Sequence, residues 1–226
     1  MPRWSGAFAD RRRSGKMAGK IHHILCSMWQ AAAKRNDRLF RKNADFSGWM
    51  SQKEAGFTEK QGNQYQPVTD GLVKVLKHFS ISEKDAILDL GCGKGKAMYL
   101  MSRFSFGRIE GYDLSPELVR IANDNFQRLE VQKCRAAQGD AMDYDGYDDF
   151  NYFFTFNAFP QEVFEVMIGH VMESIRRKPR VCRFIYLHPV CHAYLTEHTP
   201  FRLIFRRKSL ISWFDYYCYE YRPLQQ

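Results

Sequence analysis

AILDLGCGKGKAMYL, residues 86–100, is the most informative stretch of this chain. Its first five residues are apolar except for Asp89, a pattern that predicts a strand buried on both faces. Glycines follow at positions 91, 93 and 95, and glycine permits backbone angles that other residues rarely adopt. Good helix formers begin at Lys96. A strand, a glycine turn and a helix in this order predict the first crossover of a doubly wound α/β fold, whose ligands bind beyond the carboxyl ends of the strands.

The spacing of the glycines disfavours two of the three ligands that bind such turns. The dinucleotide pattern G-x-G-x-x-G needs a glycine at position 96, where this chain has Lys96. A phosphate-binding P-loop needs Ser or Thr after Gly-Lys, but Gly95 and Ala97 follow the two lysines. The pattern that remains is D-x-G-x-G-x-G, which runs from Asp89 to Gly95 and includes Cys92.

A second acid follows at the distance expected for a ribose contact. The chain predicts a strand from Arg108 to Tyr112, then Asp113, then a helix with Ser115 as its N-cap. A carboxylate at the tip of such a strand, about 20 residues after the glycines, can accept hydrogen bonds from both hydroxyls of a ribose. The alternative is a solvated loop acid, which the strand before Asp113 and the cap after it disfavour.

Later segments predict the rest of a seven-stranded, mostly parallel sheet between helical layers. The segments predicted as strands are 150–156 and 181–187, with an amphipathic helix over 163–178 between them and an antiparallel hairpin in the aromatic C-terminus. A first core helix is predicted over 68–79. These elements predict one domain.

These motifs resemble those of the class I S-adenosylmethionine (SAM) methyltransferases, and in particular a small bacterial family of them. The resemblance covers about residues 38–222 and includes the upstream segments RLFRKNADFSG and GNQYQPV. It implies a Rossmann-like fold with an N-terminal helical extension, SAM as the cofactor and S-adenosylhomocysteine as the product. The residues that it implies for cofactor binding are Asp89, Gly91, Cys92, Gly93, Gly95, Asp113, Leu114, Asp140, Ala141 and Asn157.

Asp140 is chosen for the adenine amino group because Gly-Asp is followed by the small Ala141, as in the methyltransferase segment that AAQGDAMDY resembles. Four nearby acids compete for this role, at positions 143, 145, 148 and 149.

The resemblance places the acceptor beside Asn157, Ala158 and Phe159, where the family usually has Asn-Pro-Phe. It implies that the amide and a backbone carbonyl accept hydrogen bonds from an attacking nitrogen, although the proline is displaced to Pro160. Tyr65 matches the family's Tyr-x-Pro motif. Its ring either faces the sulfonium, an attraction of ~0.5 to 2 kcal/mol, or merely pins the linker to the domain. Asn157, Phe159 and Tyr65 are the predicted catalytic residues.

Composition limits the class of protein. With 226 residues and 45% hydrophobic content, the chain can bury one good core. Its six cysteines lack paired C-x-x-C spacing, and no apolar run approaches the ~20 residues of a membrane span, so a cytoplasmic location without membrane contact is expected. HPVCHAYLTEH, residues 188–198, matches no standard zinc spacing, and no metal is expected. His188 or His192 as an acceptor-side base is a weaker alternative.

The basic charge is concentrated at the N-terminus. Residues 1–60 carry 13 Lys or Arg against 5 Asp or Glu, whereas residues 61–226 carry 21 against 20. We expect a disordered basic tail over 1–19, a helix over 21–40 and a linker within a covering segment 20–64, and the methyltransferase domain over 65–226. A solvated tail is favoured over a nucleic-acid contact.

The sequence therefore predicts a SAM-dependent methyltransferase with a nitrogen acceptor, either a small molecule or a protein lysine. The alternative is a nucleic-acid-binding or RNA-methylating protein on the same scaffold, suggested by the basic tail. A nucleotide-dependent oxidoreductase is a further rival, which Lys96 in place of glycine disfavours.

Overall fold

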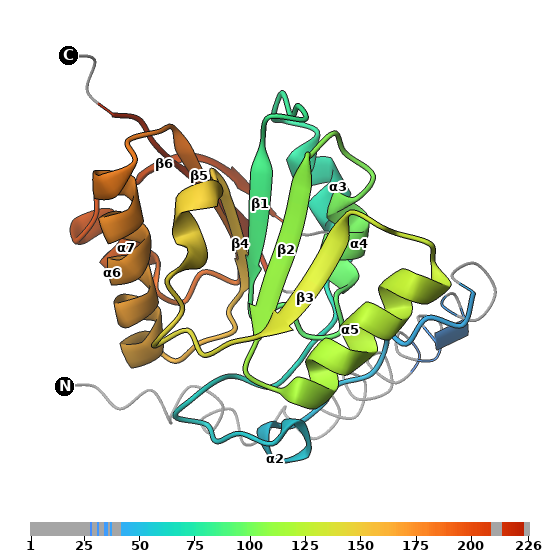
Figure 1. The fold of residues 1–226 in the computed structure, drawn as a ribbon. Coiled ribbons are helices and arrows are strands. Elements are labelled where there is room, and N and C mark those ends of the chain that lie inside the picture. The colour runs from blue at the N-terminus through green and yellow to red at the C-terminus, as the bar shows by residue number, and fades with distance from the viewer. Residues whose placement is uncertain are drawn as a thin grey trace, which may run out of the picture.

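The computed structural model describes residues 42–208 and 214–223, together with the isolated positions 28, 31, 34, 35 and 37. The predicted basic tail and most of the helix predicted over 21–40 lie outside the described residues. The described part is a mixed α/β structure in which helices cover both faces of one sheet (Figure 1).

The sheet has seven strands in the order β3-β2-β1-β4-β5-β7-β6, which confirms the predicted architecture. The strands are β1 Ala86–Leu90, β2 Arg108–Asp113, β3 Cys134–Gln138, β4 Tyr152–Phe156, β5 Cys182–Leu187, β6 Arg202–Arg207 and β7 Tyr216–Tyr221. Strands β1 to β5 pair in parallel, and β7 pairs antiparallel with both β5 and β6. Because β1 lies between β2 and β4, the chain changes direction across the sheet at β1, and such a switch point is where open α/β sheets bind ligands.

Two layers of helices bury the two faces of the sheet. The helices are α2 Gln52–Ala55, α3 Gly71–Leu76, α4 Lys96–Met101, α5 Pro116–Arg128, α6 Gln161–Arg177 and α7 His192–Glu197, with the short 3-10 helix η2 Gly146–Asp149. One core cluster contains apolar side chains of α3, α4 and α5, and the other contains those of α6 and α7. Every residue of β1 is buried, as expected for a strand covered on both faces.

Local signals explain where several elements begin and end. Ser115 caps α5 as predicted, since its hydroxyl accepts a hydrogen bond from the backbone N–H of Leu118 at 3.3 Å. Helix α3 is shorter than the predicted 68–79, because the N–H groups of His78 and Phe79 bond three residues back, to Val75 and Leu76, and tighten the end of the helix. Strand β4 begins two residues later than predicted because Phe150 forms the C-cap of η2.

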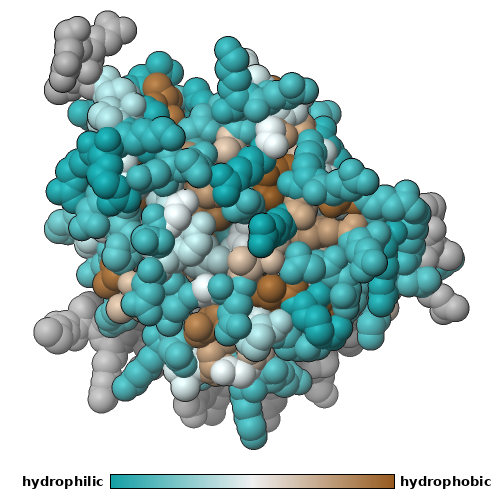
Figure 2. Space-filling model, in the orientation of Figure 1, coloured by the Kyte–Doolittle hydropathy of each residue, from teal (hydrophilic) through white to brown (hydrophobic). Residues whose placement is uncertain are grey.

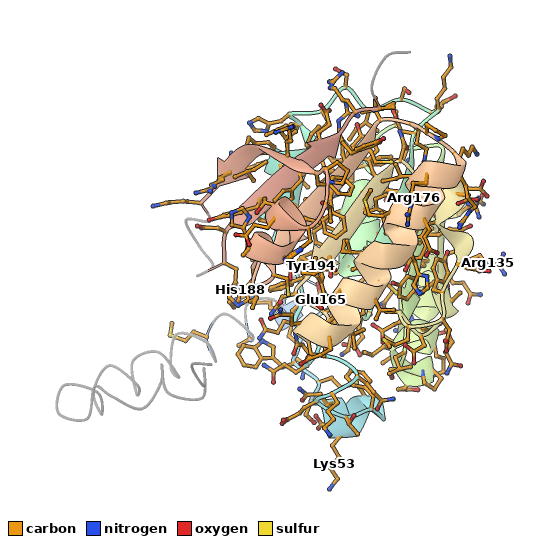
Figure 3. All side chains as sticks on the ribbon, turned by 90° about the vertical axis from the view of Figure 1, so that its left-hand side faces the viewer. Lys53, Arg135, Glu165, Arg176, His188 and Tyr194 are labelled. Atoms are coloured by element: carbon orange, nitrogen blue, oxygen red, sulfur yellow. The ribbon has the colours of Figure 1, made fainter. Side chains whose placement is uncertain are left out.

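The segment over 42–66 crosses below the carboxyl ends of the strands (Figure 1). It is tied to the rest of the protein by Asp45, whose carboxylate lies 2.9 Å from the ammonium of the buried Lys94. The Asp45 backbone N–H also donates to the side-chain oxygen of Asn125 at 2.7 Å. Helix α2 within this segment exposes Lys53, which points away from the protein (Figure 3). The predicted domain boundary between residues 64 and 65 stays a prediction.

The surface seen in Figure 2 is mostly hydrophilic, with hydrophobic residues scattered across it. The described cysteines are free thiols, and all five are buried. Within 42–208 and 214–223, no helix is both long enough and apolar enough to cross a membrane.

Candidate active site

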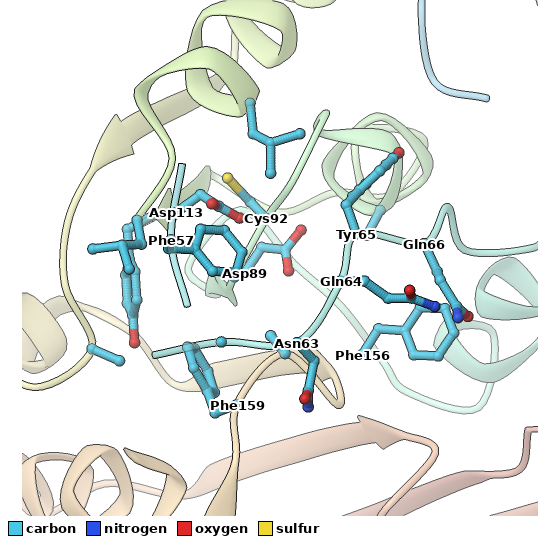
Figure 4. Close-up of a pocket in the computed structure, with 18 of the residues that line it drawn as sticks. Phe57, Asn63, Gln64, Tyr65, Gln66, Asp89, Cys92, Asp113, Phe156 and Phe159 are labelled. Atoms are coloured by element: carbon cyan, nitrogen blue, oxygen red, sulfur yellow. The ribbon is translucent and has the colours of Figure 1, made fainter. Parts of the chain in front are cut away.

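A pocket lies beyond the carboxyl ends of the central strands, where the fold predicts a ligand (Figure 4). Its walls come from the strand ends, from the segment 57–68 and from residues after β4. Nine of the twelve predicted site residues line it: Tyr65, Asp89, Gly91, Cys92, Asp113, Leu114, Asp140, Ala141 and Phe159. Gly93, Gly95 and Asn157 are not among the lining residues.

The glycine turn adopts the backbone angles that the sequence suggested. Gly91, Gly93 and Gly95 have φ values of 78°, 53° and 79°, all in the left-handed region that favours glycine. The close neighbours differ from those expected, however, because side chains of the protein itself lie against the turn. A Cβ atom on Gly93 would lie 2.3 Å from the Tyr65 ring, and one on Gly91 would lie 2.4 Å from the Cβ of Ala158. The turn therefore needs glycine for internal packing as well as for its backbone angles.

Asp113 joins the end of β2 to the glycine turn. Its Oδ2 accepts a hydrogen bond from the Gly93 N–H at 2.9 Å, and its Oδ1 accepts one from the Ser115 N–H at 3.0 Å. Burial raises the pKa of this carboxyl, and the two backbone hydrogen bonds partly oppose the shift. A carboxylate oxygen can accept more than one hydrogen bond, so Asp113 retains capacity for hydroxyl groups of a ligand.

Asp89, at the carboxyl end of β1, has a buried oxygen without a partner. The residue is 1% exposed, and its Oδ2 has no hydrogen-bond partner among the described residues. Burial, followed by the nearby Asp113, raises the pKa of Asp89 well above its ordinary value. A buried unpaired carboxyl oxygen that faces a pocket fits a ligand with a cationic or N–H group.

Asp140, chosen from the sequence because it precedes Ala141, is the acid after β3 that lines the pocket, and its role at the adenine stays a prediction. Its Oδ1 accepts a hydrogen bond from the Met142 N–H at 2.9 Å, which fixes the side chain. The competing acids do not line the pocket, and two of them have other partners. Asp148 pairs with Arg177 at 2.8 Å, and Asp149 pairs with Arg108 at 2.9 Å.

Tyr65 uses its hydroxyl and its ring in different ways. The hydroxyl donates a hydrogen bond to the backbone oxygen of Phe46 at 2.8 Å, and burial raises its pKa well above the usual value. The Tyr65 backbone pairs with Met50 in an isolated antiparallel bridge. These contacts pin the linker, which is one of the two expected roles. The ring also lines the pocket beside Gly93, so its predicted role near the sulfonium stays a prediction.

The residues after β4 form the opposite wall. Phe156, Ala158 and Phe159 line the pocket, but Asn157 turns its side chain to β5, where its Oδ1 accepts a hydrogen bond from the Tyr186 hydroxyl at 3.3 Å. Asn157 has a positive φ of 41°, a conformation that asparagine tolerates better than most residues. Asn157 is therefore not among the described residues that line the pocket, and its expected contact with the ligand stays a prediction.

Several lining residues were not predicted from the sequence. Gln64 and Gln66 lie near Phe156 on one side of the pocket, and Phe57 lies near Asp113 on the other (Figure 4). The two glutamines flank Tyr65 in the segment GNQYQPV, so their alternation with Tyr65 was a usable signal. Phe57 precedes that segment, and no sequence pattern indicated that it would line the pocket.

The histidines considered as bases lie elsewhere. His192 forms a hydrogen bond with the Tyr219 hydroxyl at 2.9 Å, and His188 packs against Phe214. Burial lowers the pKa of both, and neither lines the pocket. Among the described residues, no group of three or more His, Cys, Asp or Glu side chains could hold a metal ion.

The strand order, the glycine turn and the acids at three strand ends fit a class I SAM-dependent methyltransferase domain, with SAM as its cofactor. Residues 87–178 match the family model described as a methyltransferase domain, and the chain therefore carries such a domain. No curated protein is significantly similar to the chain.

Two solved structures of methyltransferases share the fold. An RNA methyltransferase from Salinibacter ruber in complex with S-adenosyl-L-homocysteine is 15% identical, with a TM-score of 0.53 over 71% of this chain and 97% of that chain. A magnesium protoporphyrin IX methyltransferase from Synechocystis with bound SAM is 17% identical, with a TM-score of 0.53 over 68% of this chain and 77% of that chain. The YcgJ protein from Bacillus subtilis is 23% identical, with a TM-score of 0.45. The match covers 51% of this chain and 49% of that chain, so this chain spans about half the length of YcgJ.

Proposed function

We propose that this protein transfers the methyl group of SAM to a nitrogen atom of an acceptor that enters beside residues 156–159. The observation that carries this proposal is the continuity of one pocket from the acids at the strand ends to the loop after β4. A cofactor held at the acids and an acceptor held at the loop would meet within that pocket, and such positioning supplies much of the rate of a transfer reaction.

The residues present fit the cofactor. Asp113 would hold the ribose hydroxyls, Asp140 the adenine amino group, and the unpaired Oδ2 of Asp89 a cationic group of the methionine part. When bound, SAM supplies a methyl group already activated by a sulfonium. The protein's own task is then to align the acceptor and to exclude water, and the apolar side chains of Phe156 and Phe159 suit the second task.

The choice of nitrogen rests on the resemblance of this loop to one whose oxygens accept hydrogen bonds from an attacking nitrogen. The backbone carbonyls of Asn157 and Ala158 each accept one hydrogen bond from Asn63, and a carbonyl oxygen has a second lone pair for an acceptor N–H. A small molecule and a protein lysine both satisfy this chemistry. RNA methylation that uses the basic N-terminal residues is the alternative, and a cytoplasmic location remains a prediction.

Transfer of a labelled methyl group tests the proposal. The protein would be incubated with methyl-tritiated SAM and with a cell lysate separated into protein, RNA and small molecules. We expect stable label in the protein or small-molecule fraction, on a nitrogen atom in the recovered product. Label confined to RNA would favour the alternative, and label on oxygen would contradict the nitrogen assignment.

A further inference from the structure

Asn63 connects two pocket walls that are far apart in the sequence. Its side-chain Nδ2 donates a hydrogen bond to the backbone oxygen of Asn157 at 2.7 Å, and its backbone N–H donates to the oxygen of Ala158 at 2.8 Å. One residue thus satisfies two successive carbonyls of the loop after β4. Asn63 itself lines the pocket next to Gln64 (Figure 4).

The loop that Asn63 contacts has an unusual local geometry. Asn157 has a φ of 41°, and Ala158 follows it without the ring that would restrict a proline. The side chain of Ala158 lies against the glycine turn, since a Cβ on Gly91 would be 2.4 Å away. Within the loop, the Ala158 N–H donates a long hydrogen bond of 3.5 Å to the Thr155 hydroxyl, so contacts from outside help to hold the loop against the cofactor turn.

Asn63 is itself held in place by the segment around it. Two residues on, the Tyr65 N–H donates to the Met50 oxygen at 2.9 Å, and the Tyr65 hydroxyl bonds to Phe46. Just before it, Gly62 packs against Phe57, because a Cβ there would lie 3.1 Å from the Phe57 ring. The two donors of Asn63 are therefore presented to the loop by an anchored segment.

The geometry points to Asn63 as a positioning residue for methyl transfer, which fixes the loop of residues 157–159 so that an acceptor lies in line with the cofactor. This inference rests on the proposed function. Asn63 acts through the loop carbonyls and needs no contact with the reacting atoms. The segment 57–66 thereby takes part in the reaction, because a shift of this segment would also shift the loop 157–159, beside which the acceptor lies.

Two substitutions separate hydrogen bonding from space filling. Asn63→Ala removes the side-chain donor, whereas Asn63→Asp keeps the shape but places a carboxylate oxygen against the Asn157 carbonyl. If Asn63 orients the loop, the aspartate variant is the slower of the two. If it only fills space, the aspartate variant is nearly normal and the alanine variant is the impaired one.

Asn151→Ala is the matched control. The Asn151 side chain also bonds a distant backbone, since its Oδ1 accepts from the Ala86 N–H at 2.9 Å, and its Nδ2 donates to Asp85 at 2.8 Å. It lies at the amino ends of β1 and β4, opposite the pocket. The Asn151→Ala variant therefore measures how much stability is lost when a side-chain amide that bonds a distant backbone is removed.

The experiment measures single-turnover transfer from methyl-tritiated SAM into the lysate fraction that the parental chain labels most, together with the SAM dissociation constant. We expect Asn63→Ala to slow transfer by about tenfold or more and Asn63→Asp to slow it further, with SAM affinity within about twofold of the parental value. Asn151→Ala should transfer at close to the parental rate. Parental transfer by Asn63→Asp, or equal slowing by Asn63→Ala and Asn151→Ala, would overturn the positioning role.

Amide hydrogen exchange keeps this test distinct from that of the proposed function. If the parental chain labels no fraction, the proposed function fails, and the exchange rate of the peptide 156–160 decides the inference. Faster exchange in Asn63→Ala than in both the parental chain and Asn151→Ala supports the inference that Asn63 fixes the loop of residues 157–159. Unchanged exchange overturns it.

Discussion

Asp113 has two tasks at the tip of β2. It faces the pocket, and it accepts hydrogen bonds from the N–H groups of Gly93 and Ser115. A substitution here therefore affects the glycine turn as well as any ribose contact. The sequence suggested only the second task, because nothing in the spacing shows that the Asp113 carboxylate reaches back to the turn.

Asp113→Ala should abolish measurable SAM binding and also lower thermal stability. Two buried backbone N–H groups lose their acceptor, at about 1 to 3 kcal/mol for each unsatisfied group. Calorimetric titration and thermal unfolding check the two effects, with Asp124→Ala as a control, since Asp124 lies half-buried on α5 and pairs with Arg120. Unchanged SAM affinity in a folded variant would contradict the ribose assignment.

Asp89→Asn should raise the thermal stability of the cofactor-free protein at neutral pH. Burial raises the pKa of Asp89 above its ordinary value of 3.8, so the folded state binds more protons than the unfolded state as the pH rises past 3.8. The unfolding free energy therefore falls with rising pH, and removing the titrating group removes part of that fall.

Thermal unfolding from pH 4 to pH 8 measures this effect, and Asp89→Asn should show the flatter profile. The same variant should bind SAM more weakly, because the acceptor for a cationic group has lost its charge. An equally steep profile in both proteins would contradict the assignment of the raised pKa to Asp89.

At the scale of elements, the loop after β4 departs from the proline pattern of the family that the sequence resembles. A residue before proline is driven toward extended angles, whereas Asn157 here has a φ of 41°. Alanine at position 158 is therefore compatible with the observed loop, and proline would oppose it.

Ala158→Pro should slow methyl transfer by about tenfold or more at saturating SAM, because it forces Asn157 out of its observed conformation and shifts the acceptor wall. Ala158→Ser keeps the backbone N–H and adds no ring, so it should remain within about threefold of the parental rate. Single-turnover rates of the two variants decide the question. A proline variant as fast as the parental chain would show that the observed angle of Asn157 is unimportant for transfer.

The elements that could be predicted from the sequence are those encoded locally. The strand before Gly91, the Ser115 cap and the acid Asp140 each depend on neighbours within a few residues. The structure confirms the strand and the cap, and it places Asp140 in the pocket lining. The contact of Asn63 with Asn157 joins residues 94 positions apart, and the Tyr65 ring against Gly93 depends on how the N-terminal segment crosses the sheet. Neither contact has a local pattern that could have indicated it.

At the scale of the whole molecule, we expect the strongly basic N-terminal residues to take no part in the pocket. The described pocket lining begins at Phe57, whereas the charged run RRRSGK occupies positions 11–16. A run of like charges contributes little to a packed core. Cofactor binding and the basic N-terminal charge are thus expected to be independent.

Removing residues 1–16 should leave SAM affinity and the thermal unfolding temperature unchanged. The reason is that the pocket lining, as far as the chain is described, begins at residue 57, and that a charge run predicted to be solvated contributes little to stability. Calorimetry and thermal unfolding of the shortened and full chains give the comparison. A steep loss of transfer to RNA on truncation, with RNA affinity that falls as salt rises, would favour the RNA-methylating alternative.

Calorimetric titration of the full chain with SAM, and separately with NADH, tests most directly whether this pocket is a methyltransferase site. The account predicts binding of SAM at one site per chain, competition by S-adenosylhomocysteine, and no binding of NADH, because Lys96 replaces the third glycine of a dinucleotide turn. Binding of NADH without binding of SAM would contradict it.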